Sequence, residues 1–225
     1  MIDFANVRNI VIPEGEVFSI ASGAEILWRK QKYKRELLYL ESTGTQHIET
    51  DIPLTSNSRF EIVAEITSKP TTGSALFGAR GSSANNNNIG VAIGTGSLAI
   101  DFTNSAYSTF RAAYNVEDAV GQKLTFVGDK TMRAFYDAGG NLLASNNTVC
   151  TDDITTKGFW IFTQNGVSSS WVKANAKVYS AKDWENTELV CDLIPVLDWD
   201  DIPCLYDKVT DELFYNQGTG EFLYG

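Results

Sequence analysis

The sequence predicts an all-β protein folded as a sandwich or a barrel. Short apolar and aromatic runs recur along the chain with turn residues between them, and helical periodicity is almost absent. The segment from Ser58 to Thr67 alternates apolar and polar residues, which is typical of a strand with one buried face. No internal repeat of the kind that marks a propeller or a solenoid is found. Only Lys182 to Thr187 is expected to form a helical turn.

The two ends of the main β region carry related patterns. Glu36 to Glu41 and Gln46 to Asp51 are predicted strands separated by a polar turn, and the chain from Pro203 to Gly225 contains further short aromatic strands. Because chain ends often meet in compact domains, we expect Phe222-Leu223 to lie beside Leu38 to Leu40.

The strands between these ends follow one another at short, even spacing. The run FWIFTQ at 159–164 is almost continuously apolar, which indicates a central strand, and two polar loops, at 80–88 and 165–170, flank predicted strands. Further strands are expected at residues 74–79, 89–93, 98–102, 107–112, 123–127, 132–136, 141–145 and 171–180.

Residues 1–33 are predicted to form a separate N-terminal β arm, and residues 34–225 the sandwich. Strands are expected in the arm at 7–12, 16–21 and 24–28, and the basic run at 29–35 reads as a solvated linker. The arm has too few apolar residues to form its own core. It is therefore expected to pack on the sandwich, on a copy of itself in a homo-oligomer, or on a partner.

Composition narrows the classes of partner. The formal net charge is -10, and lysine and arginine cluster only at 29–35, which argues against nucleic-acid binding. Cys150, Cys191 and Cys204 are too few for a disulfide framework and are expected to be buried thiols. The N-terminus lacks the apolar run of a signal peptide, and no stretch is long enough to cross a membrane. We expect synthesis in the cytoplasm and no membrane insertion.

Four segments carry a resemblance to a known family. They are YLESTGTQHIET, LFGAR, AKVYSAKDWENTELVCDLIPV and LYDKVTDELFYNQGTGEF. Together they resemble concanavalin A-like (laminin-G-like) sandwich domains, which occur in tail and baseplate proteins of phages and prophages. IPEGEVFSIASGAEILW resembles the short adaptor segments that precede such domains. The resemblance implies an antiparallel jelly roll, a location in the virion tail after synthesis in the host bacterial cytoplasm, and other tail subunits as partners.

An enzymatic role is not expected, and no catalytic residue is assigned. Relatives of the sandwich include glycoside hydrolases, which hold two carboxylates roughly 5 to 9.5 Å apart. The best pair here, Glu61 and Glu65, would lie about 13 Å apart along one strand. His47 has no accompanying nucleophile motif and is expected on a sheet face. A glycoside hydrolase is kept as a distant alternative.

No metal ligand or cofactor is assigned either. Acidic groups occur at Asp152-Asp153 and at 198–201, and the resemblance makes a calcium ion at the rim conceivable. Their spacing matches no defined calcium loop, so solvated acidic turns are the favoured interpretation.

The polar loops favour carbohydrate binding. Sugar sites combine an aromatic face with amide or guanidinium groups. We predict a site at one rim of the sandwich, with Trp171 as the stacking platform and Arg80, Asn86, Gln164 and Asn165 as hydrogen-bonding groups. The expected function is recognition of a host cell-surface polysaccharide by a phage tail protein. The alternatives are that these polar residues only form turns, and that the domain is a purely structural part of the virion.

Overall fold

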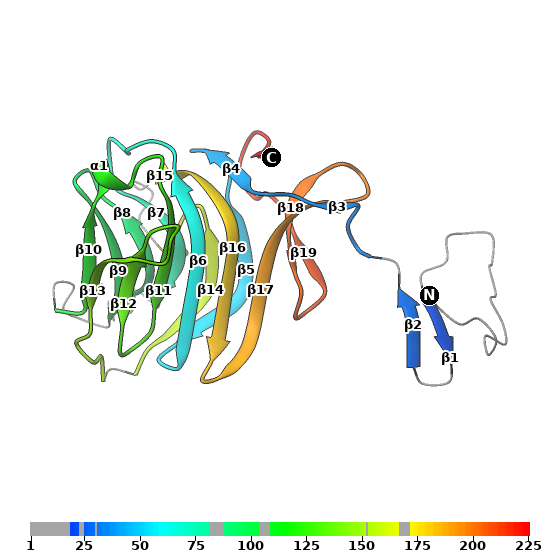
Figure 1. Ribbon diagram of the computed structural model, residues 1–225, viewed down its shortest axis with the longest axis horizontal. Coiled ribbons are helices and arrows are strands. Elements are labelled where there is room, and N and C mark those ends of the chain that lie inside the picture. Colours follow the sequence, from blue (N-terminus) through cyan, green and yellow to red (C-terminus); the bar gives the residue numbers. More distant parts are fainter. Residues whose placement is uncertain are drawn as a thin grey trace.

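The computed structural model describes residues 19–22, 25–29, 31–81, 88–103, 109–151, 153–166 and 172–225. Two large, predominantly antiparallel sheets face one another and enclose the core (Figure 1). The predicted all-β sandwich is confirmed.

The smaller sheet has seven strands in the order β10-β9-β8-β7-β14-β5, with β15 paired to β7. Most neighbours are antiparallel, and β15 runs parallel to β7. Its strands are β5 (Ile48–Thr55), β7 (Ser74–Arg80), β8 (Asn88–Ile93), β9 (Ser97–Thr103), β10 (Arg111–Asn115), β14 (Thr155–Ile161) and β15 (Val172–Lys173).

The larger sheet has eleven strands, with the path β13-β12-β11-β6-β16-β17-β18-β19 and three short strands off this path: β3 pairs with β17, β4 with β16, and β20 with β4. Its main strands are β6 (Ser58–Ile66), β11 (Lys123–Gly128), β12 (Arg133–Tyr136), β13 (Leu142–Asn146), β16 (Asn175–Glu185), β17 (Glu188–Leu197), β18 (Pro203–Asp207) and β19 (Glu212–Phe214). The short strands are β3 (Arg35–Glu36), β4 (Leu40–Thr43) and β20 (Leu223–Tyr224).

The two ends of the sandwich are neighbours, as expected. Leu223 pairs with Glu41, and Tyr224 pairs with Leu40 in antiparallel register. The Leu38 backbone N–H also donates to the Gly225 carbonyl at 2.5 Å. The predicted meeting of Phe222-Leu223 with Leu38–Leu40 is confirmed.

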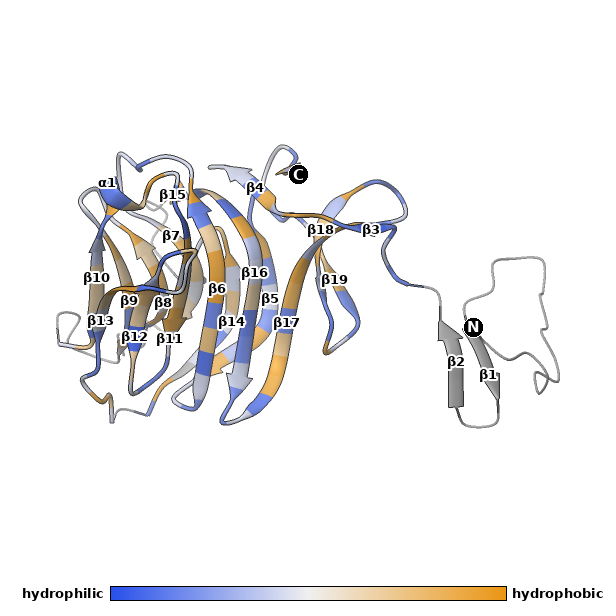
Figure 2. Ribbon diagram, viewed as in Figure 1, coloured by the Kyte–Doolittle hydropathy of each residue, from blue (hydrophilic) through white to orange (hydrophobic). Residues whose placement is uncertain are grey.

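The core lies between the sheets because each strand turns alternate side chains inward. Along β6 every second residue is buried, and Figure 2 shows apolar and polar residues alternating on this strand. Phe60 from β6 contacts Phe77 from β7 at a ring-centroid distance of 5.0 Å, and Phe77 contacts Phe159 from β14 at 4.9 Å. Aromatic side chains from both sheets therefore interlock across the sandwich.

The helical turn is not where the sequence was expected to place it. Residues 182–185 continue β16, and Asn186 takes a positive φ of 57° in the tight turn to β17. The described helix is α1 (Val116–Ala119), which begins where the Asn115 side chain accepts a hydrogen bond from the Glu117 N–H at 2.9 Å. The N-cap side chain decides the position of this short helix.

Several predicted strands differ from the observed ones. The strand expected at 171–180 is divided between β15 and β16, which belong to different sheets. The strand expected at 36–41 is divided between β3 and β4, since Leu37 turns into the core between them. The strand expected at 107–112 is found as β10 at 111–115, while residues 104–108 lie outside the described part of the chain.

In the N-terminal region, β1 (Ser19–Ser22) and β2 (Glu25–Arg29) form a separate two-stranded antiparallel sheet (Figure 1). The strand expected at 7–12 lies outside the described residues. The basic segment that follows is not fully solvated, because Tyr33 is buried against Val196 and Cys204. The Lys34 N–H also donates to the Leu197 carbonyl at 2.8 Å.

Cys150, Cys191 and Cys204 are buried thiols, as expected. Burial raises the pKa of the Cys204 thiol to about 12 and raises that of Cys191 as well. Among the described residues, the structure has no helix of the length and apolar character needed to span a membrane.

Candidate functional site

The outer face of the seven-stranded sheet carries a half-buried tryptophan on β14, the strand between β7 and the edge strand β5. Phe159 and Ile161 belong to the core, so the alternation along β14 turns Trp160 to the opposite face. Trp160 is in register with Gly78 of β7 on one side and with Glu49 of β5 on the other. The indole therefore lies between two strands that bring different polar groups to it.

On the β7 side, two glycines leave space for a polar side chain above the sheet. Gly78 has a φ of +131°, and a Cβ there would lie 2.3 Å from the Ile89 carbonyl oxygen. A Cβ on the paired Gly90 would lie 2.4 Å from the Phe77 oxygen. Gln164 Nε2 lies 3.1 Å and 2.9 Å from these two positions. The sheet can accept the Gln164 amide here because neither glycine has a side chain.

A buried hydrogen-bond chain fixes that amide. Gln164 Nε2 donates to Asn88 Oδ1, and Asn88 Nδ2 donates to Asp101 Oδ2 at 3.1 Å. Arg111 then donates to both Asp101 oxygens, at 2.7 and 2.9 Å. Gln164, Asn88 and Asp101 are all buried. A satisfied chain of this kind holds its members rigidly.

Arg80 and Asn165 lie at the end of this chain. Arg80 Nε donates to Gln164 Oε1 at 3.2 Å, and the Arg80 N–H donates to the Asn165 carbonyl at 2.8 Å. Asn165 Nδ2 donates to the Gly158 carbonyl at 2.7 Å. Both side chains remain partly exposed. The structure thus brings Arg80, Gln164 and Asn165 together.

The assembled group comes from the end of β7 and from the segment that follows β14. Gln164 is buried and committed to internal hydrogen bonds, so it positions other groups. Asn86 and Trp171 lie outside the described residues, and their predicted roles stay predictions. Trp160 was missed because it lies within an apolar run, although its place between two core residues marks it as outward-facing.

On the β5 side, His47 packs against Trp160, with ring centroids 5.4 Å apart. His47 Nε2 lies 3.0 Å from Glu49 Oε1, while Nδ1 is buried and has no hydrogen-bond partner among the described residues. The proton is therefore assigned to Nε2, which donates to the carboxylate. Glu49 keeps 43% of its side chain exposed, so it can accept further hydrogen bonds.

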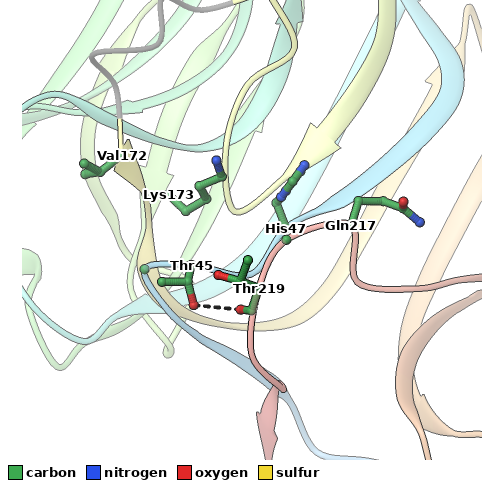
Figure 3. Close-up of a pocket in the computed structure, with 8 residues that line it drawn as sticks. Thr45, His47, Val172, Lys173, Gln217 and Thr219 are labelled. Atoms are coloured by element: carbon green, nitrogen blue, oxygen red, sulfur yellow. Dashed lines mark hydrogen bonds between the residues drawn. The ribbon is translucent and has the colours of Figure 1, made fainter.

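Beyond His47 the surface is hollowed into a pocket of about 440 Å³ (Figure 3). Its walls come from the turn before β5, from β15 and from the segment before β20. The labelled lining residues are Thr45, His47, Val172, Lys173, Gln217 and Thr219.

The acidic residues weighed as a catalytic pair lie on the other sheet. Glu61 and Glu65 are both on β6, where Glu61 contacts Arg59 at 3.4 Å. Glu65 accepts hydrogen bonds from Lys177 Nζ and the Tyr179 hydroxyl, each at 3.1 Å. The bond to Glu65 raises the pKa of Lys177. Both carboxylates are thus engaged by neighbouring side chains.

The acidic turn considered for calcium is closed by its own hydrogen bonds. Asp198 accepts from the Asp200 and Ile202 N–H groups at 2.9 and 2.8 Å and from the Tyr215 hydroxyl at 3.0 Å. Burial and this bond to Asp198 raise the pKa of Tyr215 to about 12. Within the described ranges, no group of three or more histidine, cysteine or acidic residues is arranged to hold a metal ion. Asp152 is outside those ranges.

No protein-family model matches the chain, and no curated protein matches it. Among solved structures, it is similar to a Trypanosoma rangeli sialidase in complex with 2,3-difluorosialic acid, with 11% identity and a TM-score of 0.40 over 70% of this chain and 27% of that one. The same sialidase in complex with 2,3-difluoro-KDN gives 12% identity and 0.40 over 68% and 26%. A mutant of it displaying trans-sialidase activity gives 11% and 0.39 over 70% and 27%. The chain thus spans about a quarter of these proteins.

The comparison corrects one expectation. The prediction that this chain is not an enzyme is withdrawn, because the three solved structures named above are sialidases, one of them a mutant displaying trans-sialidase activity. At this identity and TM-score, the likeness transfers neither the activity nor its residues to this chain.

Proposed function

We propose that this chain is a saccharide-recognition protein of a phage or prophage tail. It would bind host-surface polysaccharide on the outer face of the seven-stranded sheet. The observation that carries this proposal is the position of Trp160, a half-buried indole between the Arg80–Gln164–Asn165 group and the His47–Glu49 pair.

The chemistry of the face suits a sugar ring. An indole offers a broad apolar surface to the C–H face of the sugar ring, while charged and amide groups around the indole can form hydrogen bonds with the sugar hydroxyls. Arg80 can donate, Glu49 can accept, and Asn165 can do both. The buried chain from Gln164 to Asp101 holds the β7 side in place before the ligand arrives. Such preorganisation lowers the entropic cost of binding.

The phage-tail context rests on the sequence motifs that resemble concanavalin A-like domains of tail and baseplate proteins. The confirmed β-sandwich and the separate β1-β2 hairpin are compatible with this context. The hairpin is the proposed contact with other tail subunits or with copies of this chain. Repetition on a virion would raise the avidity of weak single sites by about 10²- to 10⁴-fold.

The test is a binding screen against a broad array of bacterial surface polysaccharides, in which the full-length wild type is compared with the Trp160→Ala variant. We expect this substitution to weaken binding at least tenfold, which corresponds to about 1.4 kcal/mol, because it removes the stacking surface. Trp184→Ala is the matched control, since Trp184 is also half-buried but lies on β16 of the other sheet, beside Arg59. A reducing-end assay on the same mixtures reports whether a bound polysaccharide is also cleaved.

Equal binding by the wild type and both variants would show that Trp160 is not part of the binding site. If the wild type binds no polysaccharide on the array or on candidate host cells, recognition is ruled out. The purely structural virion domain is then the better account.

A further inference from the structure

The pocket beside His47 differs in charge from the rest of the molecule. The chain has a formal net charge of -10, yet none of the 8 lining residues is acidic. Lys173 and His47 are its ionisable members. We infer that this pocket receives an anionic substituent, a carboxylate or a phosphate, carried by the saccharide. This inference rests on the proposed function and names the class of saccharide.

Lys173 supplies the positive charge. Within the part of the chain that the structure describes, no carboxylate pairs with it, whereas Lys177 pairs with Glu65 at 3.1 Å and Lys182 pairs with Asp192 at 3.7 Å. Lys173 is a half-buried residue that lines the pocket. A compact ammonium with three N–H groups suits either anion as a point charge.

The opposite wall is preformed and polar. Thr45 Oγ1 donates to the Thr219 carbonyl at 2.8 Å, and the Thr219 N–H donates to the Thr45 carbonyl at 3.2 Å. The Gln217 N–H donates to the His47 carbonyl at 2.8 Å. A Cβ on Gly218 would lie 2.1 Å from the Thr45 oxygen, so this close approach requires glycine. The Thr219 hydroxyl adds a donor at this wall (Figure 3).

The pocket adjoins the proposed stacking platform. His47 lines the pocket and its ring centroid lies 5.4 Å from that of Trp160, so one side chain separates the two. The Glu49 carboxylate is hydrogen-bonded to His47 and does not line the pocket. A volume of about 440 Å³ lies within the range of small-molecule sites. A sugar on Trp160 could therefore direct a charged substituent toward Lys173.

The experiment compares polysaccharides that differ only in this charge. Alginate, polygalacturonate and hyaluronate are each paired with their carboxyl-reduced forms, and a wall teichoic acid provides the phosphate arm. Affinities are measured by biolayer interferometry for the full-length wild type, Lys173→Gln and Lys123→Gln. Lys123→Gln is the matched control, because it removes the same charge from β11 of the other sheet, where the Lys123 ammonium contacts the Tyr179 ring.

We expect the wild type to bind an acidic polymer at least tenfold more tightly than its neutral form. Lys173→Gln should reduce that preference to less than about threefold without changing the affinity for neutral polymer, and Lys123→Gln should leave the preference intact. A stronger response to teichoic acid than to any uronate assigns phosphate within the same inference.

Two outcomes overturn the inference. If acidic and neutral forms bind equally, or if Lys173→Gln keeps the preference, the anion site is wrong. The proposed function then still stands provided that Trp160→Ala weakens binding at least tenfold. If no polymer of either kind binds, both the inference and the proposed function fail.

Discussion

Asp183 is a buried carboxyl group whose raised pKa should lower the stability of the sandwich as the pH rises from about 4 to 8. It lies on β16 with 1% of its surface exposed, accepts a hydrogen bond from the Ser58 hydroxyl at 3.4 Å, and has no partner for Oδ1 among the described residues. Burial, with a smaller effect of the Glu185 charge, raises its pKa from 3.8 to about 8. The folded protein therefore keeps a proton that the unfolded chain releases.

The pKa difference sets the sign and size of the effect. Because the folded-state pKa is raised, the contribution of Asp183 to stability is fully present below pH 3.8 and is lost as the pH rises through 8. Each pH unit between these values costs about 1.4 kcal/mol. The loss is on the order of 4 kcal/mol at pH 7. Asp183→Asn removes this loss, because the amide has nearly the same shape and cannot ionise.

The assay is urea unfolding of the wild type and Asp183→Asn from pH 4 to pH 9. The difference in unfolding free energy should be near zero at pH 4, grow in favour of the variant, and level off above pH 8. Asp207→Asn is the control: Asp207 is also buried but accepts from the Asp192 and Val209 N–H groups at 2.8 and 3.0 Å. Its substitution should destabilise by about 1 kcal/mol or more. A difference for Asp183→Asn that does not change with pH would refute the reasoning.

Three further substitutions test the fold that supports the site. Gly78→Ala should destabilise the protein strongly in thermal unfolding, because the added Cβ would lie 2.3 Å from the Ile89 carbonyl oxygen. Gly96→Ala should be tolerated, because a Cβ at Gly96 would meet no atom within 4 Å. Equal effects of the two substitutions would argue against the tight β7–β8 contact. Phe77→Ala should cost about 3–5 kcal/mol in urea unfolding, and a loss under about 1 kcal/mol would contradict its central place in the core. Asn115→Ala should cost about 0.5–2 kcal/mol by removing the cap of α1, and no change would show that the cap contributes nothing.

The sandwich could be predicted from the sequence where one face of a strand is apolar and the other is polar. Ser58 to Thr67 shows this pattern clearly, and β6 was found at Ser58–Ile66. The meeting of the chain ends could be anticipated because both end segments carry short aromatic strands. The predicted element boundaries were wrong where a single side chain decides them, as Asn115 does for α1 and Leu37 does between β3 and β4.

The candidate site could be predicted only in part. Arg80, Gln164 and Asn165 were chosen by residue type, and their meeting depends on the contact between β7 and the segment after β14, which spacing alone does not reveal. Trp160 escaped notice because an outward-facing tryptophan in an apolar run hides the alternation of the strand. The role of Gly78 depends on cross-strand register, for which the sequence holds no local signal.

The most direct test of the proposed saccharide face is fluorine NMR of the full chain labelled with 5-fluorotryptophan. The sequence has 5 tryptophans, so each signal can be assigned by single substitution. The protein is titrated with the polysaccharide that binds best in the screen. The proposal predicts that the Trp160 signal shifts or broadens in step with binding, while the signals of Trp184 and Trp199 stay unchanged. Saturating binding that leaves the Trp160 signal in place would contradict it.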